Sequence, residues 1–212
     1  MLFCWGLPGA GKTIIAAIVI DSLETRFQTD NSVGIAYLFC DFKLQDQKPE
    51  DLLRSLLRQL VGEGSVPDNV MGLFNRYKLK KEPPLLKDIS KVLSSVISSY
   101  SRVFIVVDAL DECQRRCRMP FVKEMLSLQT ETEVNILATS RAIPEVVKAF
   151  EGKASLEIRA SKEDVRKHID ENLSQLPSCV QRSKSLQDEI KAEIGKAADG
   201  MYVISFLDHQ TG

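Results

Sequence analysis

The chain has 212 residues, five cysteines and a formal net charge of −1, with 28 basic and 29 acidic side chains. This length allows one large or two small domains, and the near-neutral charge gives no basic field of the kind that nucleic-acid-binding proteins use. An odd number of cysteines without framework spacing argues against a disulfide scaffold and favours a reducing compartment. We therefore expect a globular, cytoplasmic protein that does not bind nucleic acid.

The first predicted strand, Leu2 to Trp5, leads into GLPGAGKT at Gly6 to Thr13. These eight residues match the phosphate-loop (Walker A) pattern G-x-x-x-x-G-K-[ST] at every position. Gly6, Gly9 and Gly11 lack a Cβ, so the backbone can adopt positive φ there and turn its N–H groups toward phosphate oxygens. The alternative is a glycine-rich turn that matches by chance.

The end of this motif supplies a cation and a hydroxyl. Lys12 can contact phosphates, Thr13 can bind Mg²⁺, and the apolar helix predicted from Thr13 to Phe27 directs its N-terminal N–H groups at the same anion. Because this helix is apolar nearly all round, we expect it to be buried between a sheet and other helices. The candidate nucleotide-binding residues are Gly6, Pro8, Gly9, Ala10, Gly11, Lys12, Thr13 and Ile14.

No membrane segment or leader is predicted. The phosphate loop begins where the cleavage region of a signal peptide would lie, and the longest apolar run is too short to span a bilayer. We therefore expect no membrane partner.

The next elements alternate between strand and helix patterns. Val33 to Phe42 is β-branched and aromatic, which predicts a strand covered on both faces. Helices are then predicted from Pro49 to Val61, Pro67 to Tyr77 and Leu85 to Tyr100.

An apolar strand that closes on acids follows. Val103 to Val107 ends in Asp108, which at the carboxyl end of the strand can hold Mg²⁺ beside Thr13. Asp111 and Glu112 come next, where either can orient or deprotonate a water. The alternative is a solvated acidic loop after a core strand.

The chain continues with a helix predicted at Pro120 to Leu128 and a strand at Val134 to Thr139. Arg141 follows this strand and either contacts a γ-phosphate or is a surface arginine that caps the loop. A helix at Ile143 to Phe150 and a strand at Ala154 to Ile158 complete this part. Cys113 and Cys117 are close in sequence, but without a second pair they make a poor metal site.

The C-terminal part is predicted to be helical. Capping-box signals at Ser161 with Asp164 and at Ser185 with Asp188 start two helices, with Gly200 as a C-terminal cap. The apolar segment Met201 to Leu207 has nothing after it to pack against, so we expect the chain to be truncated at this end. We assign no chemistry to His168 and His209.

Together these motifs resemble those of NACHT nucleoside triphosphatases of the STAND class, and more narrowly the nephrocystin-like phosphate-loop domains of fungal NLR-like proteins. The resemblance implies an α/β, three-layer P-loop NTPase with a mostly parallel sheet over residues 1–159, followed by the start of a helical subdomain over residues 160–212. The segments that carry it are GLPGAGKT at 6–13, FIVVDALDEC at 104–113, LATSR at 137–141, EIRASKEDV at 157–165 and ADGMYV at 198–203.

The resemblance also implies a signalling NTPase in which bound ATP or GTP switches a monomer to an assembly. Lys12 would hold the β- and γ-phosphates, and Thr13 with Asp108 (Walker B) the Mg²⁺. Asp111 or Glu112 would act on the water, and Arg141 would sense the γ-phosphate. Such proteins continue into a winged helix and repeats, so protein partners or self-association would involve flanking domains that this chain lacks.

Two other functions stay open. A small-molecule kinase shares the phosphate loop but needs an arginine-rich lid and an acceptor pocket, which the sequence does not indicate. A non-catalytic fragment would keep the fold and act only as an interaction surface.

Overall fold

The computed structural model describes residues 1–44, 46–62, 66–159, 163, 167, 170–172 and 177–197, with backbone only for 194–197. Some of the expectations above lie outside these residues: the capping box of Ser161 and Asp164, the cap at Gly200, the apolar segment Met201–Leu207, and His168 and His209.

The chain divides into two compact units, which are described separately. The first contains residues 1–5 and 12–156, and the second contains residues 6–11 and 157–212. Our division into residues 1–159 and 160–212 stays a prediction.

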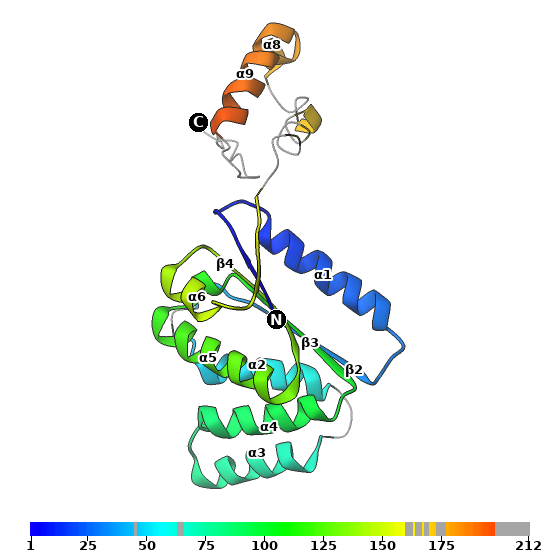
Figure 1. Cartoon of the computed structure of the whole chain (residues 1–212), viewed down its shortest axis with the longest axis vertical. Coiled ribbons are helices and arrows are strands. Elements are labelled where there is room, and N and C mark those ends of the chain that lie inside the picture. Colours follow the sequence, from blue (N-terminus) through cyan, green and yellow to red (C-terminus); the bar gives the residue numbers. More distant parts are fainter. Residues whose placement is uncertain are drawn as a thin grey trace. The chain divides into compact units, whose positions relative to one another are not determined.

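In the described part of the chain, one sheet of five strands has the spatial order β2-β3-β4-β1-β5 (Figure 1). The strands are β1 (Leu2–Trp5), β2 (Val33–Phe39), β3 (Arg102–Asp108), β4 (Asn135–Ser140) and β5 (Ala154–Glu157). The pairs β2–β3, β3–β4 and β4–β1 are parallel, so the last residues of these four strands lie at one edge of the sheet. The predicted α/β fold with a mostly parallel sheet is confirmed.

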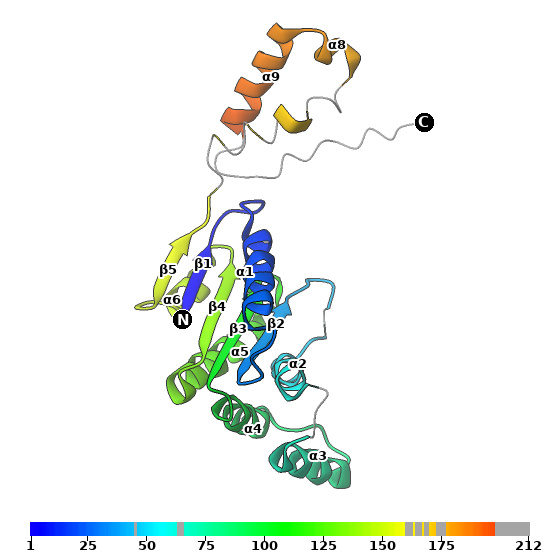
Figure 2. The same ribbon diagram turned by 90° about the vertical axis from the view of Figure 1, so that its right-hand side faces the viewer.

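Helices cover both faces of this sheet. They are α1 (Lys12–Phe27), α2 (Pro49–Val61), α3 (Asp68–Lys80), α4 (Leu86–Ser98), α5 (Arg115–Thr132) and α6 (Pro144–Ala149). Figures 1 and 2 show α1 on one face and α2, α4 and α5 on the other, with α3 packed outside α4.

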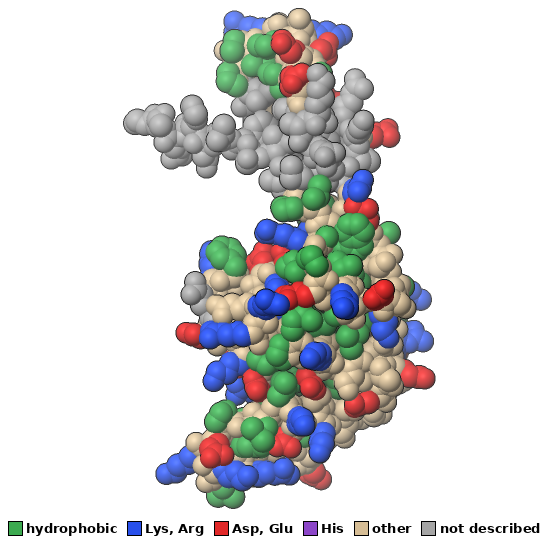
Figure 3. Space-filling view, turned by 60° about the vertical axis from the view of Figure 1, so that its left-hand side comes forward, with side chains coloured by type: hydrophobic (Ala, Val, Ile, Leu, Met, Phe, Trp, Pro, Cys, Tyr) green, Lys and Arg blue, Asp and Glu red, His purple; other side chains and the backbone are tan. Residues whose placement is uncertain are grey.

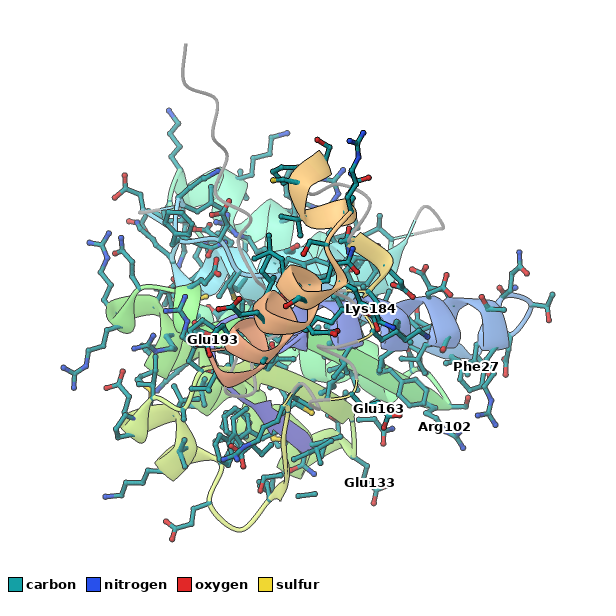
Figure 4. All side chains as sticks on the ribbon, turned by 90° about the horizontal axis from the view of Figure 1, so that it is seen from above. Phe27, Arg102, Glu133, Glu163, Lys184 and Glu193 are labelled. Carbon is teal, nitrogen blue, oxygen red and sulfur yellow. The ribbon has the colours of Figure 1, made fainter. Side chains whose placement is uncertain are left out.

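The larger core lies under α2, α4, α5 and α6. Five leucines of α2 are buried there, as are Ile89, Leu93, Val96 and Ile97 of α4. On the opposite face, Ala16 and Ile20 of α1 pack against Val106. At the C-terminal end of α1, Phe27 stacks on Phe104 of β3, with ring centroids 5.7 Å apart. Figure 4 labels Phe27 and also Arg102, the first residue of β3.

Three sequence-based expectations differ from the structure. The first helix is not buried all round: Ile14 and Ile18 are 60% and 59% exposed, because α1 is the one described helix of the first unit on this face and these two residues point outward. The second strand ends at Phe39, three residues early, and it is an edge strand. The fifth helix begins at Arg115 and contains Pro120 instead of starting there. Tertiary packing around Phe121 and Val122, both fully buried, outweighs the backbone hydrogen bond that a proline cannot donate.

The second unit contains two described helices, α8 (Ser178–Gln181) and α9 (Lys184–Ala197), and Figure 4 labels Lys184 and Glu193 on α9. The helix predicted near Ser185 is present, but its N-terminal cap is Ser183. The Ser183 hydroxyl oxygen accepts a hydrogen bond from the Leu186 N–H at 3.3 Å, so the cap lies two residues earlier than predicted.

The surface carries both signs of charge. On the face in Figure 3, Lys and Arg side chains are interspersed with Asp and Glu, and hydrophobic side chains lie between them. Among the residues that the structure describes, no helix has the length and apolar character that crossing a membrane requires.

Candidate functional site

Asp108, the last residue of β3, is 2% exposed and has both carboxylate oxygens engaged. Thr13 Oγ1 donates a hydrogen bond to Oδ2 at 2.7 Å, and Thr139 Oγ1 donates to Oδ1 at 2.5 Å. A buried carboxylate needs such donors, because an unpaired charge in the interior is costly. The structure thus brings together the two predicted metal ligands, Thr13 and Asp108.

Thr139 was not among the predicted site residues. It lies on β4, between β1 and β3 in the sheet, and its hydroxyl also accepts the Ala109 N–H at 2.9 Å. The sequence does show a residue with a hydroxyl group at the carboxyl end of a buried strand. It does not show that Asp108 is the partner of this hydroxyl, because that depends on the order of the strands in the sheet.

The chain turns sharply after Asp108. Ala109 has a left-handed backbone with φ 56°, which is unfavourable for a residue with a Cβ. The turn leads into a 3₁₀-helix, η1 (Leu110–Glu112), which carries the other two predicted acids. Glu112 is half-buried in this turn.

Asp111 and Arg141 pair with each other. Asp111 Oδ1 accepts the Arg141 backbone N–H at 2.9 Å, and its Oδ2 lies 2.8 Å from the Arg141 Nε. The Asp111 side chain is 7% exposed, whereas that of Arg141 is 55% exposed. The Asp111–Arg141 ion pair therefore connects η1 to the segment that follows β4.

Arg118 of α5 supports the same turn from the core side, and sequence reasoning missed it. Its Nη1 donates to the Asp111 carbonyl at 3.1 Å and to the Cys113 carbonyl at 3.3 Å, while Nη2 pairs with Glu145 Oε1 at 2.6 Å. The Arg118 hydrogen bond holds the pKa of the Glu145 carboxyl below its usual value, and Arg115 adds to this effect.

Lys12 begins α1, next to Thr13. Partial burial lowers the pKa of its ammonium group. The nearby Asp111 and Asp108 carboxylates act in the opposite direction. The Lys12 ammonium group is thus close enough to both carboxylates to interact with them electrostatically. This is the position expected of a lysine that binds an anion next to a metal ion.

The loop Gly6–Gly11 belongs to the second unit. Gly9 and Gly11 use the conformational freedom expected of them, with φ of 71° and 93°, whereas Gly6 does not have a positive φ. Glycine is needed at position 6 because there is no room for a side chain: a Cβ at Gly6 would lie 2.3 Å from the Ile158 carbonyl oxygen. Ala10 N–H donates to the Leu7 carbonyl at 3.2 Å, which closes the turn around exposed Pro8.

The pair Thr13 and Asp108 fits a magnesium ion. Both donors are oxygens, and 2.7 Å is close to the separation of about 3 Å between neighbouring ligands in an octahedron with bonds of about 2.1 Å. In the described ranges, no group of three or more His, Cys, Asp or Glu side chains could hold a metal. Water and substrate oxygens would therefore have to complete the shell.

Comparison with protein-family models matches residues 1–141 to the family described as "Nephrocystin 3, N-terminal". The matched segment ends at Arg141 and so includes every predicted site residue. No curated protein sequence matches the chain.

Several solved structures have a similar fold. The Aeropyrum pernix ORC1 protein in complex with DNA has a TM-score of 0.55 and 15% identity, covering 93% of this chain and 54% of that chain. Drosophila ORC bound to DNA has a TM-score of 0.53 and 18% identity, covering 92% and 46%. The Aeropyrum pernix ORC2 protein, solved as ADPNP–ADP complexes, has a TM-score of 0.50 and 15% identity, covering 82% and 45%. The chain spans about half the length of these proteins.

These structures correct one expectation. We excluded nucleic acid as a partner on the basis of net charge, and two proteins with this fold were solved with DNA. The exclusion was wrong because net charge averages over the whole chain, whereas contacts to DNA phosphates come from local groups of basic and polar side chains.

Replacing Thr139 by valine tests the role of its hydroxyl. The change keeps the shape but leaves the Oδ1 atom of Asp108 and the Ala109 N–H without their hydrogen-bond partner, which should lower the free energy of unfolding by about 1–3 kcal/mol. Urea denaturation measures the loss. Thr130→Val on the exposed side of α5 is the control, and an equally small effect of both changes would contradict this role.

Replacing Glu145 by glutamine tests the pairing with Arg118. Because the pKa of Glu145 is lowered in the folded state, its stabilising effect is complete above the usual value of 4.5 and is lost as pH falls through the lower value. The difference in unfolding free energy between wild type and Glu145→Gln should therefore shrink as pH falls below 4.5. Denaturation at a series of pH values checks this, with exposed Glu151→Gln as control. A difference that stays constant would disprove the pairing.

Proposed function

Because the chain belongs to the Nephrocystin 3, N-terminal family, we propose that it binds a nucleoside triphosphate with Mg²⁺ and hydrolyses it slowly as a regulatory switch. The domain is a P-loop NTPase. ATP is the nucleotide that we expect, and GTP is the alternative.

The observation that carries the proposal is the 2.7 Å contact between Thr13 and Asp108, directly after Lys12 in the chain. A hydroxyl from the start of a helix and a carboxylate from the end of a parallel strand are the two protein ligands that hold Mg²⁺ in P-loop NTPases. Support for the nucleotide also comes from the similar Aeropyrum pernix ORC2 protein, which was solved as ADPNP–ADP complexes.

In this proposal, each residue of the phosphate loop has a separate part. The backbone N–H groups of Gly9 to Lys12 bind phosphate oxygens, with positive φ at Gly9 and Gly11 setting the turn. The Lys12 ammonium group binds the β- and γ-phosphates. Mg²⁺, when bound to Thr13 and Asp108, neutralises charge on the phosphate oxygens.

We assign the general base to Glu112 and not to Asp111. Both oxygens of Asp111 are engaged by Arg141, so this carboxylate positions the turn. Glu112 is the next residue of the same 3₁₀-helix and is half-buried, so it can accept a proton from a water without first breaking the Asp111–Arg141 pair.

Arg141 keeps donors for a γ-phosphate while it is paired. Its Nε faces Asp111, but a guanidinium has five N–H donors, and more than half of the side chain is exposed. Binding a γ-phosphate through its terminal nitrogens would connect the nucleotide to Asp111 and the η1 turn. This connection is the switch in our proposal, because hydrolysis removes the group that the arginine contacts.

We further propose that the chain belongs to the NACHT branch of the STAND class, as part of an NLR-like protein. The sequences DALDE at 108–112 and TSR at 139–141 support this assignment. Protein partners or self-association would then involve flanking domains.

Lys12→Ala tests nucleotide binding. Loss of a charge-assisted contact worth about 1.5–3 kcal/mol should weaken Mg-ATP binding by roughly ten- to a hundredfold and reduce the rise in Tm that Mg-ATP gives. Calorimetric titration and thermal unfolding measure both quantities. Lys91→Ala, an exposed lysine of α4, should bind as wild type does; equal affinity of the Lys12→Ala chain would reject the site.

Glu112→Gln separates binding from hydrolysis. Without the general base, release of inorganic phosphate should fall by about 10²- to 10⁴-fold while the affinity for Mg-ATP is kept. Glu131→Gln on exposed α5 surface is the matched control. Unchanged turnover in Glu112→Gln would remove this residue from the mechanism, and phosphate that appears only on an added acceptor would favour a kinase.

A further inference from the structure

Two buried cysteines from different parts of the chain meet beside the η1 turn. Cys40 directly follows β2 and is 6% exposed, and Cys113 directly follows η1 and is 4% exposed. Their Sγ atoms lie 2.8 Å apart, one thiol donating a hydrogen bond to the other. Both belong to the larger core of the first unit, and 73 positions separate them in the sequence.

The position of these thiols does not suit a metal. Cys117 also lies in this core, yet no group of three or more candidate ligands was found in the part of the chain that the structure describes. A disulfide needs a sulfur–sulfur distance of about 2.05 Å, so the two sulfurs have to approach by less than about 1 Å. Small side-chain rotations can supply such a shift.

We propose that Cys40 and Cys113 are a reversible oxidation site, at which hydrogen peroxide or a related peroxide converts the two thiols to a disulfide. The five cysteines are free in this structure, which is the reduced form of the pair.

The surroundings select Cys113 as the attacking sulfur. The hydrogen-bond contact with Cys40 and the charge of Arg118 lower the pKa of the Cys113 thiol. Its thiolate attacks one peroxide oxygen, the O–O bond breaks, and the leaving hydroxide takes up the proton that the Cys113 thiol released. This gives a sulfenic acid on Cys113 and the first water. The Cys40 sulfur then attacks the Cys113 sulfur, the S–O bond breaks, and water leaves with the Cys40 proton. Two thiols thereby lose two electrons, and one peroxide becomes two waters. A dithiol reductant reverses the step.

A surface cavity reaches the edge of this core. The cavity has a volume of about 450 Å³ and is lined by Cys117, four residues after Cys113, and by Pro49 and Lys48. Its rim includes Asp46, whose side chain is fully exposed and pairs with Arg116. The cavity therefore extends from the surface to Cys117, in the same core as Cys40 and Cys113.

The disulfide would join two segments that flank the proposed catalytic acids. The Cys40 N–H donates to the Asp108 carbonyl at 3.1 Å, and the Cys113 carbonyl accepts from Arg118. Oxidation would thus tie the end of β2 to the turn that carries Asp111 and Glu112. An effect on turnover rests on the proposed function, but formation of the disulfide does not.

The test uses the whole chain with Cys179→Ser, because exposed Cys179 could link two chains. This variant has four thiols, and we expect peroxide to leave two, with an intact mass lower by two hydrogens. Trypsin cleaves after Arg115 and Arg116, so Cys113 and Cys117 fall on different peptides and the map identifies the partner of Cys40. Oxidation should raise Tm by up to about 10 °C, as expected for closing a long loop, and dithiothreitol should reverse both changes.

Three further variants complete the experiment. In the same background, Cys113→Ser should keep its three remaining thiols under peroxide. Cys40→Ser should stop at a sulfenic acid on Cys113, seen as a mass gain of one oxygen without a disulfide, whereas Cys117→Ser should still lose two thiols to the disulfide. The proposal is overturned if the parent variant keeps four thiols while Cys179 of wild type is oxidised in the same treatment, or if the cross-linked peptide contains Cys117 in place of Cys113. None of these readouts requires nucleotide, so failure of the proposed function would not affect them.

Discussion

The buried carboxylate of Asp108 is the group on which the rest of this site depends. A charge with 2% exposure is tolerated because Thr13 and Thr139 each donate a hydrogen bond to one of its oxygens. These donors come from the start of α1 and from β4. The Asp108 side chain therefore links three segments, β3, β4 and the start of α1, and fixes their relative positions. The left-handed backbone of Ala109 begins at this point, held by its N–H bond to Thr139.

The strand order makes this arrangement possible. Because β4 lies between β1 and β3, the residues that end β4 sit beside Asp108. Thr139 contacts the carboxylate, and the backbone of Arg141 reaches Asp111. On the other side of β3, the edge strand β2 ends beside the same residue, because the Cys40 N–H donates a hydrogen bond to the backbone carbonyl of Asp108. The acids after β3 are thus positioned by both neighbouring strands.

Local sequence patterns were enough to predict most of the elements and the contact between Thr13 and Asp108. The eight-residue phosphate loop and an apolar strand ending in aspartate are strong local signals, and both threonine and aspartate had expected roles. The burial of α1 was overestimated, because apolar composition does not show whether a second layer covers the helix. The space requirement of Gly6 depends on Ile158, which is distant in sequence.

The contacts that support the acids could not be predicted in the same way. Thr139 and Cys40 gain their partners from strand order, and Arg118 gains its partners only when α5 begins before Pro120. The pairing of Arg141 with Asp111 changes how the two acids of η1 are interpreted, because it occupies one and leaves Glu112 as the proposed base. The sequence left open which of Asp111 and Glu112 acts on the water, and contacts between residues distant in sequence are the basis for our choice of Glu112.

The most direct measurement of the central claim is the magnesium dependence of ATP binding in wild type and Asp108→Asn, by calorimetric titration with and without Mg²⁺. If Asp108 and Thr13 hold the ion, Mg²⁺ should strengthen binding to wild type and have little effect on Asp108→Asn, while both chains bind metal-free ATP through Lys12 and the loop. An equal gain in affinity from Mg²⁺ in both chains, with Asp108→Asn folded by thermal unfolding, would contradict the account.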